Sequence, residues 1–108
     1  MRRGDLITVA LSGDYGKPRP ALVIQSDQVA RTDSVLVCLL TTTLRDAPAY
    51  RISIVADDAT GLREPSQIMV DKIVAVRRDR CGPPIGRVGK ATLTELGRAL
   101  ALMTGLAD

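Results

Sequence analysis

The chain has 108 residues and a hydrophobic content of 45%, which suits one folded domain over residues 1–108 and argues against disorder. Its formal net charge of +3 is compatible with a nucleic-acid partner without requiring one. The absence of histidine excludes His–His ribonucleases, Ser-His-Asp hydrolases and histidine-based metal sites. The absence of Trp and Phe argues against binding of single strands on aromatic stacking platforms.

The cysteines and the N-terminus bear on cellular location. Cys38 lies inside an apolar run and is expected in the core, whereas Cys81 opens a turn-like Cys-Gly-Pro-Pro stretch. Neither belongs to a CxxC pair, so we predict no zinc site, and their pairing with each other stays open. Gly4-Asp5 follows Arg2-Arg3 where a signal peptide would need an apolar stretch, so we predict no signal peptide. No apolar run approaches the ~18 residues of a membrane span. We therefore predict a cytoplasmic protein with no cofactor, no metal and no membrane contact.

Apolar runs separated by turn residues predict a series of short strands. A loop rich in Gly, Lys and Pro follows the first run at 12–18, and the polar stretch 26–33 suits one helical turn. Pro83 and Pro84 should break the chain before a short last strand. The predicted strands are residues 6–11, 21–25, 35–42, 50–55, 66–76 and 85–88.

The period changes near the C-terminus, where apolar residues recur at helical spacing. Thr92 is a candidate N-cap, with Glu95 completing a capping box, and Gly105 is a candidate stop. The apolar stripe should pack on the core or on a second subunit. Its members are Leu93, Leu96, Leu100 and Met103.

Strands followed by one helix predict a mainly β protein, built as a small, twisted antiparallel barrel capped by the C-terminal helix.

Arg19 is the first candidate for a phosphate contact. It precedes Pro20 at the start of an apolar run, so the strand behind it should hold its guanidinium, whose planar fork matches phosphate oxygens. Thr41 and Thr42 end another apolar run and bring hydroxyl groups. The alternatives are an arginine on a solvated rim and threonines placed by β propensity alone. The basic segment 77–80 is interpreted first as a solvated turn, with a phosphate contact as the alternative.

An ordered set of motifs spans nearly the whole chain and resembles the MazF/PemK family of toxin–antitoxin ribonucleases. The resemblance implies an SH3-like barrel, a homodimer, cleavage of single-stranded RNA, and a cognate antitoxin protein that binds an overlapping groove. The motifs are Arg3-Gly4-Asp5-Leu6-Ile7, Arg19-Pro20-Ala21-Leu22-Val23-Ile24-Gln25, Leu39-Leu40-Thr41-Thr42-Thr43, Glu64-Pro65-Ser66-Gln67-Ile68-Met69-Val70-Asp71-Lys72-Ile73 and Ile85-Gly86-Arg87-Val88-Gly89.

The resemblance also implies which residues act. By position, Arg19 and Thr41 match functional residues of the family, with Thr42 as the alternative register. The loop 12–18 would contact RNA and be displaced by the antitoxin. The remaining substrate-binding candidates are Lys17, Tyr15, Pro20, Thr42 and Gln67.

Asp71 is the candidate general base and resembles an acidic position that some members use. Its apolar neighbours would favour the neutral acid and make it useful for proton transfer near neutral pH. Lys72 follows it rather than Gln, and Met69 stands where some relatives carry a second Arg, so the general acid is not assigned. The alternative for Asp71 is a surface ion pair, for example with Arg51.

The chemistry fits RNA, because RNA supplies its own nucleophile, the 2′-hydroxyl. Attack on the adjacent phosphorus needs a proton acceptor, a proton donor and positive charge on the phosphate, but no metal. Metal-dependent hydrolysis needs converging carboxylates, and most of those here lie in predicted turns. Two other functions remain open. One is a gyrase poison of the CcdB type, whose known members rely on a C-terminal Trp that this chain lacks. The other is a non-catalytic SH3-like binding module.

Overall fold

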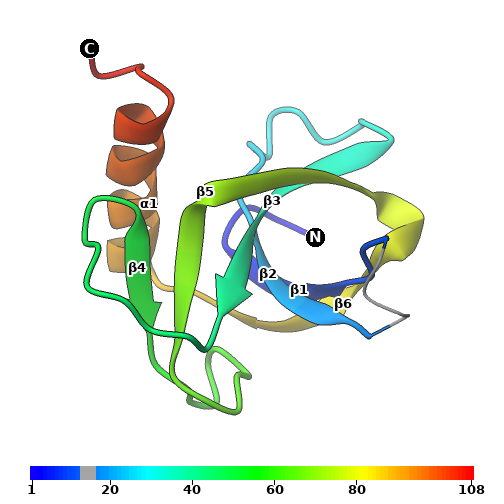
Figure 1. Ribbon diagram of the computed structural model, residues 1–108. Helices are drawn as coiled ribbons and strands as arrows, with labels where there is room; N and C mark the ends of the chain where they lie inside the picture. Colours follow the sequence, from blue (N-terminus) through cyan, green and yellow to red (C-terminus); the bar gives the residue numbers. More distant parts are fainter. Residues whose placement is uncertain (13–16) are drawn as a thin grey trace.

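The computed structural model describes residues 1–12 and 17–108, and Figure 1 shows a strongly curved sheet with one helix beside it. The sheet is antiparallel, with strand order β4-β5-β3-β2-β1-β6. The mainly β class with a C-terminal helix is therefore confirmed. In the described ranges β4 and β6 do not pair, so the barrel is not fully closed. The elements are β1 (Asp5–Val9), β2 (Arg19–Val23), β3 (Ser34–Thr41), β4 (Arg51–Ile54), β5 (Ser66–Arg77), the 3-10 helix η1 (Arg78–Arg80), β6 (Cys81–Arg87) and α1 (Lys90–Met103).

Two clusters of buried side chains lie on the two faces of the sheet, because successive side chains of a strand point to opposite faces. We call the cluster that includes residues of α1 the helix-side core, and the other the inner core. The helix-side core contains Leu6, Leu22, Ile24, Cys38, Leu40, Ile52, Ile54, Ile68, Val70, Val88, Leu96 and Ala99, and the inner core contains Ile7, Val9, Ala21, Val23, Val35, Val37, Leu39 and Val76.

Both cysteines are free thiols. Cys38 is fully buried, as predicted, and burial raises the pKa of its thiol to about 12, so it stays protonated at neutral pH. Cys81 opens β6 rather than a turn, and partial burial raises the pKa of its thiol as well.

A large bulge in β5 breaks the alternation that the sequence predicted for this strand. Cys38 of β3 lies opposite Ile73, but Leu40 lies opposite Ile68, so four residues at 69–72 span the place of one partner. Asp71 lies in this bulge and is exposed. The expectation that apolar neighbours surround Asp71 is therefore wrong, because its side chain is exposed at the bulge.

The last strand differs most from the prediction. Pro83 and Pro84 do not break the chain but lie within β6, which runs continuously from Cys81 to Arg87. β6 is an edge strand of the sheet, and within residues 1–12 and 17–108 it pairs with β1 alone, with two shifts of register. Proline is tolerated there because one side of an edge strand needs no backbone donors. The first five strands end within two residues of their predicted bounds.

The C-terminal helix is confirmed, but its start is not where the sequence placed it. α1 begins at Lys90 with Gly89 as N-cap and no side-chain cap, so the capping box of Thr92 and Glu95 is wrong because both residues lie inside the helix. Gly105 has φ +78°, which confirms the stop. Within the apolar stripe, Leu96 is buried, Leu93 and Leu100 are partly buried against the helix-side core, and Met103 is exposed.

No helix in the described part of the chain is long and apolar enough to cross a membrane.

The stretch 26–33 contains no helix, but residues 27–28 form a hydrogen-bonded turn in which Val29 N donates to Ser26 O at 3.0 Å. The side chain of Arg78 holds this loop, since its Nε donates to Thr32 O at 2.6 Å and its Nη2 donates to Ala30 O at 2.9 Å. Arg77 and Asp79 form an exposed ion pair. The basic segment 77–80 is thus an exposed turn, and Arg78, the first residue of η1, binds it to the loop 26–33.

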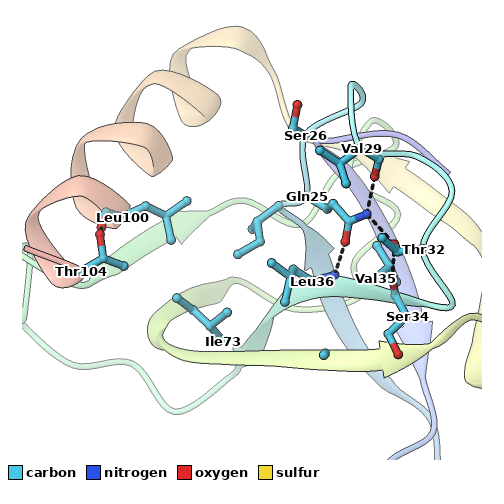
Figure 2. Close-up of a pocket in the computed structure, with 12 residues that line it drawn as sticks. Gln25, Ser26, Val29, Thr32, Ser34, Val35, Leu36, Ile73, Leu100 and Thr104 are labelled. Atoms are coloured by element: carbon cyan, nitrogen blue, oxygen red, sulfur yellow. Dashed lines mark hydrogen bonds between the residues drawn. The ribbon is translucent and has the colours of Figure 1, made fainter. Parts of the chain in front are cut away.

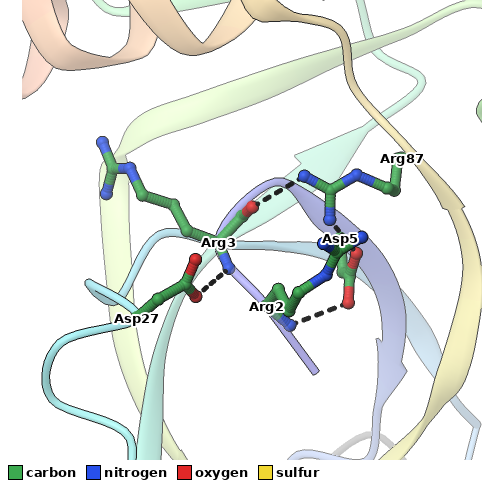
Figure 3. A network of polar contacts seen from close by, with 5 residues as sticks. All are labelled: Arg2, Arg3, Asp5, Asp27 and Arg87. Atoms are coloured by element: carbon green, nitrogen blue, oxygen red, sulfur yellow. Dashed lines mark hydrogen bonds and ion pairs between the residues drawn. The ribbon is translucent and has the colours of Figure 1, made fainter.

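A network of polar contacts ties the N-terminus to β6 (Figure 3). Asp5 is buried and pairs with Arg87, which also donates through Nη2 to Arg3 O at 3.1 Å. The backbone N–H of Arg2 donates to Asp5 Oδ2 at 2.8 Å. Gly4 has φ +96°, a conformation that favours glycine. The Arg-Gly-Asp motif therefore has a structural role in this chain.

Candidate active site

A fork between β2 and β3 brings the predicted site residues together. The two strands pair only from Ala21 opposite Leu39 to Val23 opposite Val37. Beyond that point Pro20 pairs with β1, and the end of β3 follows β5 instead. Pro20 has no backbone N–H to donate, which favours the loss of pairing here. A cavity of about 480 Å³ lies at the fork, lined by Thr8, Pro18, Pro20, Thr42, Gly61, Leu62, Arg63, Glu64, Ser66 and Ile85.

Arg19 and Thr41 flank this fork from opposite strands. Arg19 is the first residue of β2 and is exposed, and Thr41 is the last residue of β3. By alternation, Arg19 shares a face with Ala21 and Thr41 shares a face with Leu39, and both of those residues belong to the inner core. The two side chains therefore project from the same face of the sheet, whereas Pro20 lines the cavity.

Two predicted residues belong to the loop before β2. Lys17 is exposed beside Pro18 of the cavity wall. Tyr15 lies outside the described residues, as does most of the loop 12–18 that was expected to cover the site.

Gln67 holds the turn that follows Thr41. It is buried and lies directly opposite Thr41 in the pairing of β3 with β5. Its Oε1 accepts from Arg45 N at 3.0 Å, and its Nε2 donates to Arg45 O at 2.9 Å. Thr43 N donates to Thr41 Oγ1 at 3.0 Å, which orients the hydroxyl while leaving its proton able to donate. Gln67 therefore acts on Thr41 through the backbone of the turn.

Arg51 joins the same network and was not identified as a site residue from the sequence. Its Nη1 donates to Thr43 O and to Gln67 Oε1, both at 3.2 Å. Its Nε is buried without an acceptor, a state that typically costs about 1–3 kcal/mol. The alternation of residues 50–55 could have identified Arg51 from the sequence, because it places Arg51 and Ser53 on the face opposite Ile52.

Asp71 is not brought to the fork by regular pairing. It lies in the bulge of β5, two residues beyond the partly buried Met69. No ion pair of the described residues includes Asp71, so the pair with Arg51 that the sequence allowed is absent. No three Cys, Asp or Glu side chains in ranges 1–12 and 17–108 converge as a metal site would require.

The cavity wall contains charged residues that the sequence did not single out. Arg63 and Glu64 both line it and are exposed. Glu64 begins one of the motifs that carry the family resemblance, and its place in that motif could have identified it as a site residue from the sequence. The cavity thus combines donors, acceptors and apolar surface, which suits a nucleobase.

A second, apolar concavity of about 750 Å³ lies elsewhere on the molecule, between the end of α1 and the strands β3 and β5 (Figure 2). Val29, Leu36 and Ile73 line it with 53%, 42% and 36% of their surface exposed. Exposed apolar surface of this kind is typical of an interface with another protein. We call it the apolar groove.

Comparison with known proteins identifies the family. The profile described as PemK-like, MazF-like toxin of type II toxin-antitoxin system matches residues 2–104. The chain belongs to this toxin family. The match covers both strands of the fork and all the candidate residues, and it confirms the resemblance seen in the motifs.

Relatives of this MazF-like toxin match over nearly their full lengths. A protein of Mycolicibacterium smegmatis named as a probable endoribonuclease MazF is 44% identical over 108 residues, which are 99% of each chain. Endoribonuclease MazF9 of Mycobacterium tuberculosis is 30% identical over 111 residues, covering 94% of each. A solved endoribonuclease in complex with its cognate antitoxin, from a mycobacterial species, superposes with a TM-score of 0.82 at 25% identity, covering 98% of this chain and 96% of that chain.

Proposed function

We propose that this MazF-like toxin is a sequence-specific, metal-independent endoribonuclease that cleaves single-stranded RNA, in particular mRNA. The observation that carries the proposal is the match of residues 2–104 to the toxin family, together with 44% identity to a probable endoribonuclease MazF. An exposed arginine and a threonine at one sheet fork supply the donors that phosphate chemistry needs. The gyrase-poison and binding-module alternatives are not favoured.

In the proposed reaction the ribose 2′-oxygen attacks the adjacent phosphorus and the bond from phosphorus to the 5′-oxygen breaks. The 2′-hydroxyl proton passes to a base, and the leaving 5′-oxygen takes up a proton. The products carry a 2′,3′-cyclic phosphate and a 5′-hydroxyl. Arg19 stabilises the charge on the phosphorane oxygens, because such donors aimed at developing charge contribute most to catalysis. Thr41 donates its hydroxyl proton to the same phosphate.

We assign the accepting role to Asp71, whose exposure in the β5 bulge leaves it accessible to an RNA strand. Lys17 and Tyr15 are assigned to the RNA backbone, and Pro20 and Thr42 to a base held in the cavity. Gln67 contributes to substrate binding by holding the turn at 41–45. The protein would act in the cytoplasm, where its substrate is.

We assign a homodimer and an antitoxin as the protein partners. The solved relative is described as an endoribonuclease in complex with its cognate antitoxin. A toxin of net charge +3 suits an antitoxin with an acidic segment that is disordered until it binds. The apolar groove is the surface we assign to the homodimer, since exposed apolar side chains gather there.

Ile73→Glu in the groove is expected to shift the protein from dimer to monomer, because the interface would then bury an unpaired carboxylate. Analytical ultracentrifugation would measure the change relative to the 11.5 kDa chain. Val55→Glu is the matched control, because Val55 is 64% exposed and lies outside the groove. A dimer that survives Ile73→Glu with unchanged affinity would place the interface elsewhere.

Cleavage is expected to persist in excess EDTA, because the proposed reaction uses the RNA's own hydroxyl and protein donors. A labelled RNA incubated with purified toxin, with and without the chelator, provides the measurement. Loss of activity in EDTA that magnesium or manganese restores would contradict the mechanism.

A further inference from the structure

Arg51 shares a sheet face with Thr41, although Arg51 lies on the edge strand β4 and Thr41 lies on β3, with β5 between them. In the pairing of β4 with β5, Ser53 lies opposite Gln67 and Arg51 lies opposite Met69. Thr41 lies opposite Gln67 on the other side of β5. Directly paired residues project from the same face, so Arg51, Met69, Gln67 and Thr41 all lie on one face.

The charge of Arg51 is not neutralised by the protein. Its Nη1 donates to two oxygens without formal charge, Thr43 O and Gln67 Oε1. In the described ranges no carboxylate forms an ion pair with it. Its Nε is buried and has no acceptor. A half-buried guanidinium is normally paired and hydrogen-bonded, so the positive charge of Arg51 would favour binding of an anionic group on this face.

We propose that Arg51 is a second cation of the cleavage site, acting with Arg19 on the phosphate. The inference rests on the proposed function. Arg51 donates to the carbonyl of Thr43, and the N–H of Thr43 donates to Thr41 Oγ1, so the guanidinium contacts the residue that orients the hydroxyl assigned to the phosphate. When the 2′-oxygen bonds to phosphorus and the 5′-oxygen leaves, negative charge grows on these oxygens, and the guanidinium stabilises it.

Exchanging the two paired residues tests charge against structure. Arg51→Gln should lower the single-turnover cleavage rate about 100-fold with little change in affinity for RNA that carries a 2′-deoxy scissile nucleotide. The double variant Arg51→Met, Met69→Arg keeps the composition and moves the guanidinium to the partner position on the same face. It removes the original bonds to Thr43 and Gln67. Recovery of cleavage to within about tenfold of wild type is expected.

Two further variants make the result decisive. Arg51→Lys retains charge and should be faster than Arg51→Gln, which decides the question if the double variant does not fold by circular dichroism. Arg98→Gln on the exposed side of α1 removes one charge elsewhere and should cleave at the wild-type rate. Wild-type cleavage in the same assay tests the proposed function separately. An active wild type with an equally active Arg51→Gln would overturn the role of Arg51 alone. A slow Arg51→Gln that neither the exchange nor lysine improves would reduce Arg51 to a structural clamp.

Discussion

Replacing Arg19 with alanine is expected to lower the rate of RNA cleavage about 10²–10³-fold, the usual effect of removing one donor to transition-state charge. The fold should survive, because Arg19 is exposed at the first position of β2. Single-turnover kinetics on a labelled RNA would measure the loss, and thermal unfolding would check the fold. Arg19→Lys should fail almost as completely, because a point charge does not replace a two-pronged donor.

Neighbouring variants give this prediction its internal controls. Asp71→Asn should also slow cleavage strongly, since it removes the assigned proton acceptor. Thr41→Ala should lose less than Arg19→Ala, and Thr42→Ala least, because Thr42 follows the strand and lines the cavity instead. A fully active Arg19→Lys would count against the bidentate role. A larger loss at Thr42 than at Thr41 would move the catalytic hydroxyl by one residue.

Removing the 2′-hydroxyl at the scissile nucleotide is expected to abolish cleavage, because it removes the nucleophile itself. The deoxy substrate should still bind, since the phosphate, the neighbouring riboses and the bases are unchanged. It should therefore inhibit cleavage of the all-ribose RNA competitively, which initial rates at several concentrations would show. If the deoxy substrate were cut at a comparable rate, water or a protein group would be the attacker, and the roles of Arg19 and Asp71 would need reassignment.

The same RNA annealed to its complement serves as the second arm of that experiment. A duplex hides its base edges in a deep, narrow major groove. A cavity of about 480 Å³ at the fork can receive a base only when that base is unpaired. The annealed RNA should therefore resist cleavage under conditions that cut the single strand, and equal rates on both would exclude base recognition in this cavity.

Much of the candidate site could be predicted because its signals are local. Arg19 precedes an apolar strand and Thr41 ends another, and both lie at those strand ends in the structure. Their motifs also carried the family resemblance, which the match over residues 2–104 confirms. Pro20 and Thr42 meet in one cavity although they lie 22 positions apart in the chain. Local pattern placed each residue on a strand, but the fork that joins them is a tertiary feature.

The errors have a common physical cause, which is that packing overrides local preference. The capping box at Thr92 is a local signal, but α1 begins at Lys90, so Thr92 lies within the helix. Proline usually interrupts a strand because it has no backbone N–H to donate. Pro83 and Pro84 are tolerated because β6 lies at the edge of the sheet, where one side of the strand needs no donors. Asp71 looked enclosed by apolar neighbours in sequence, and the bulge of β5 exposes it.

The sequence by itself determined the mainly β class, the C-terminal helix, the positions of the first five strands and the chemistry open to a chain without histidine, because composition and alternation act residue by residue. Only the tertiary structure decided which side chains share a face across strands. Arg51 lies 10 residues beyond Thr41 in the chain, and strand register rather than sequence distance places it on the face of Thr41 and Gln67. Register depends on bulges and on pairing between distant segments, and neither is written in the pattern of any single strand.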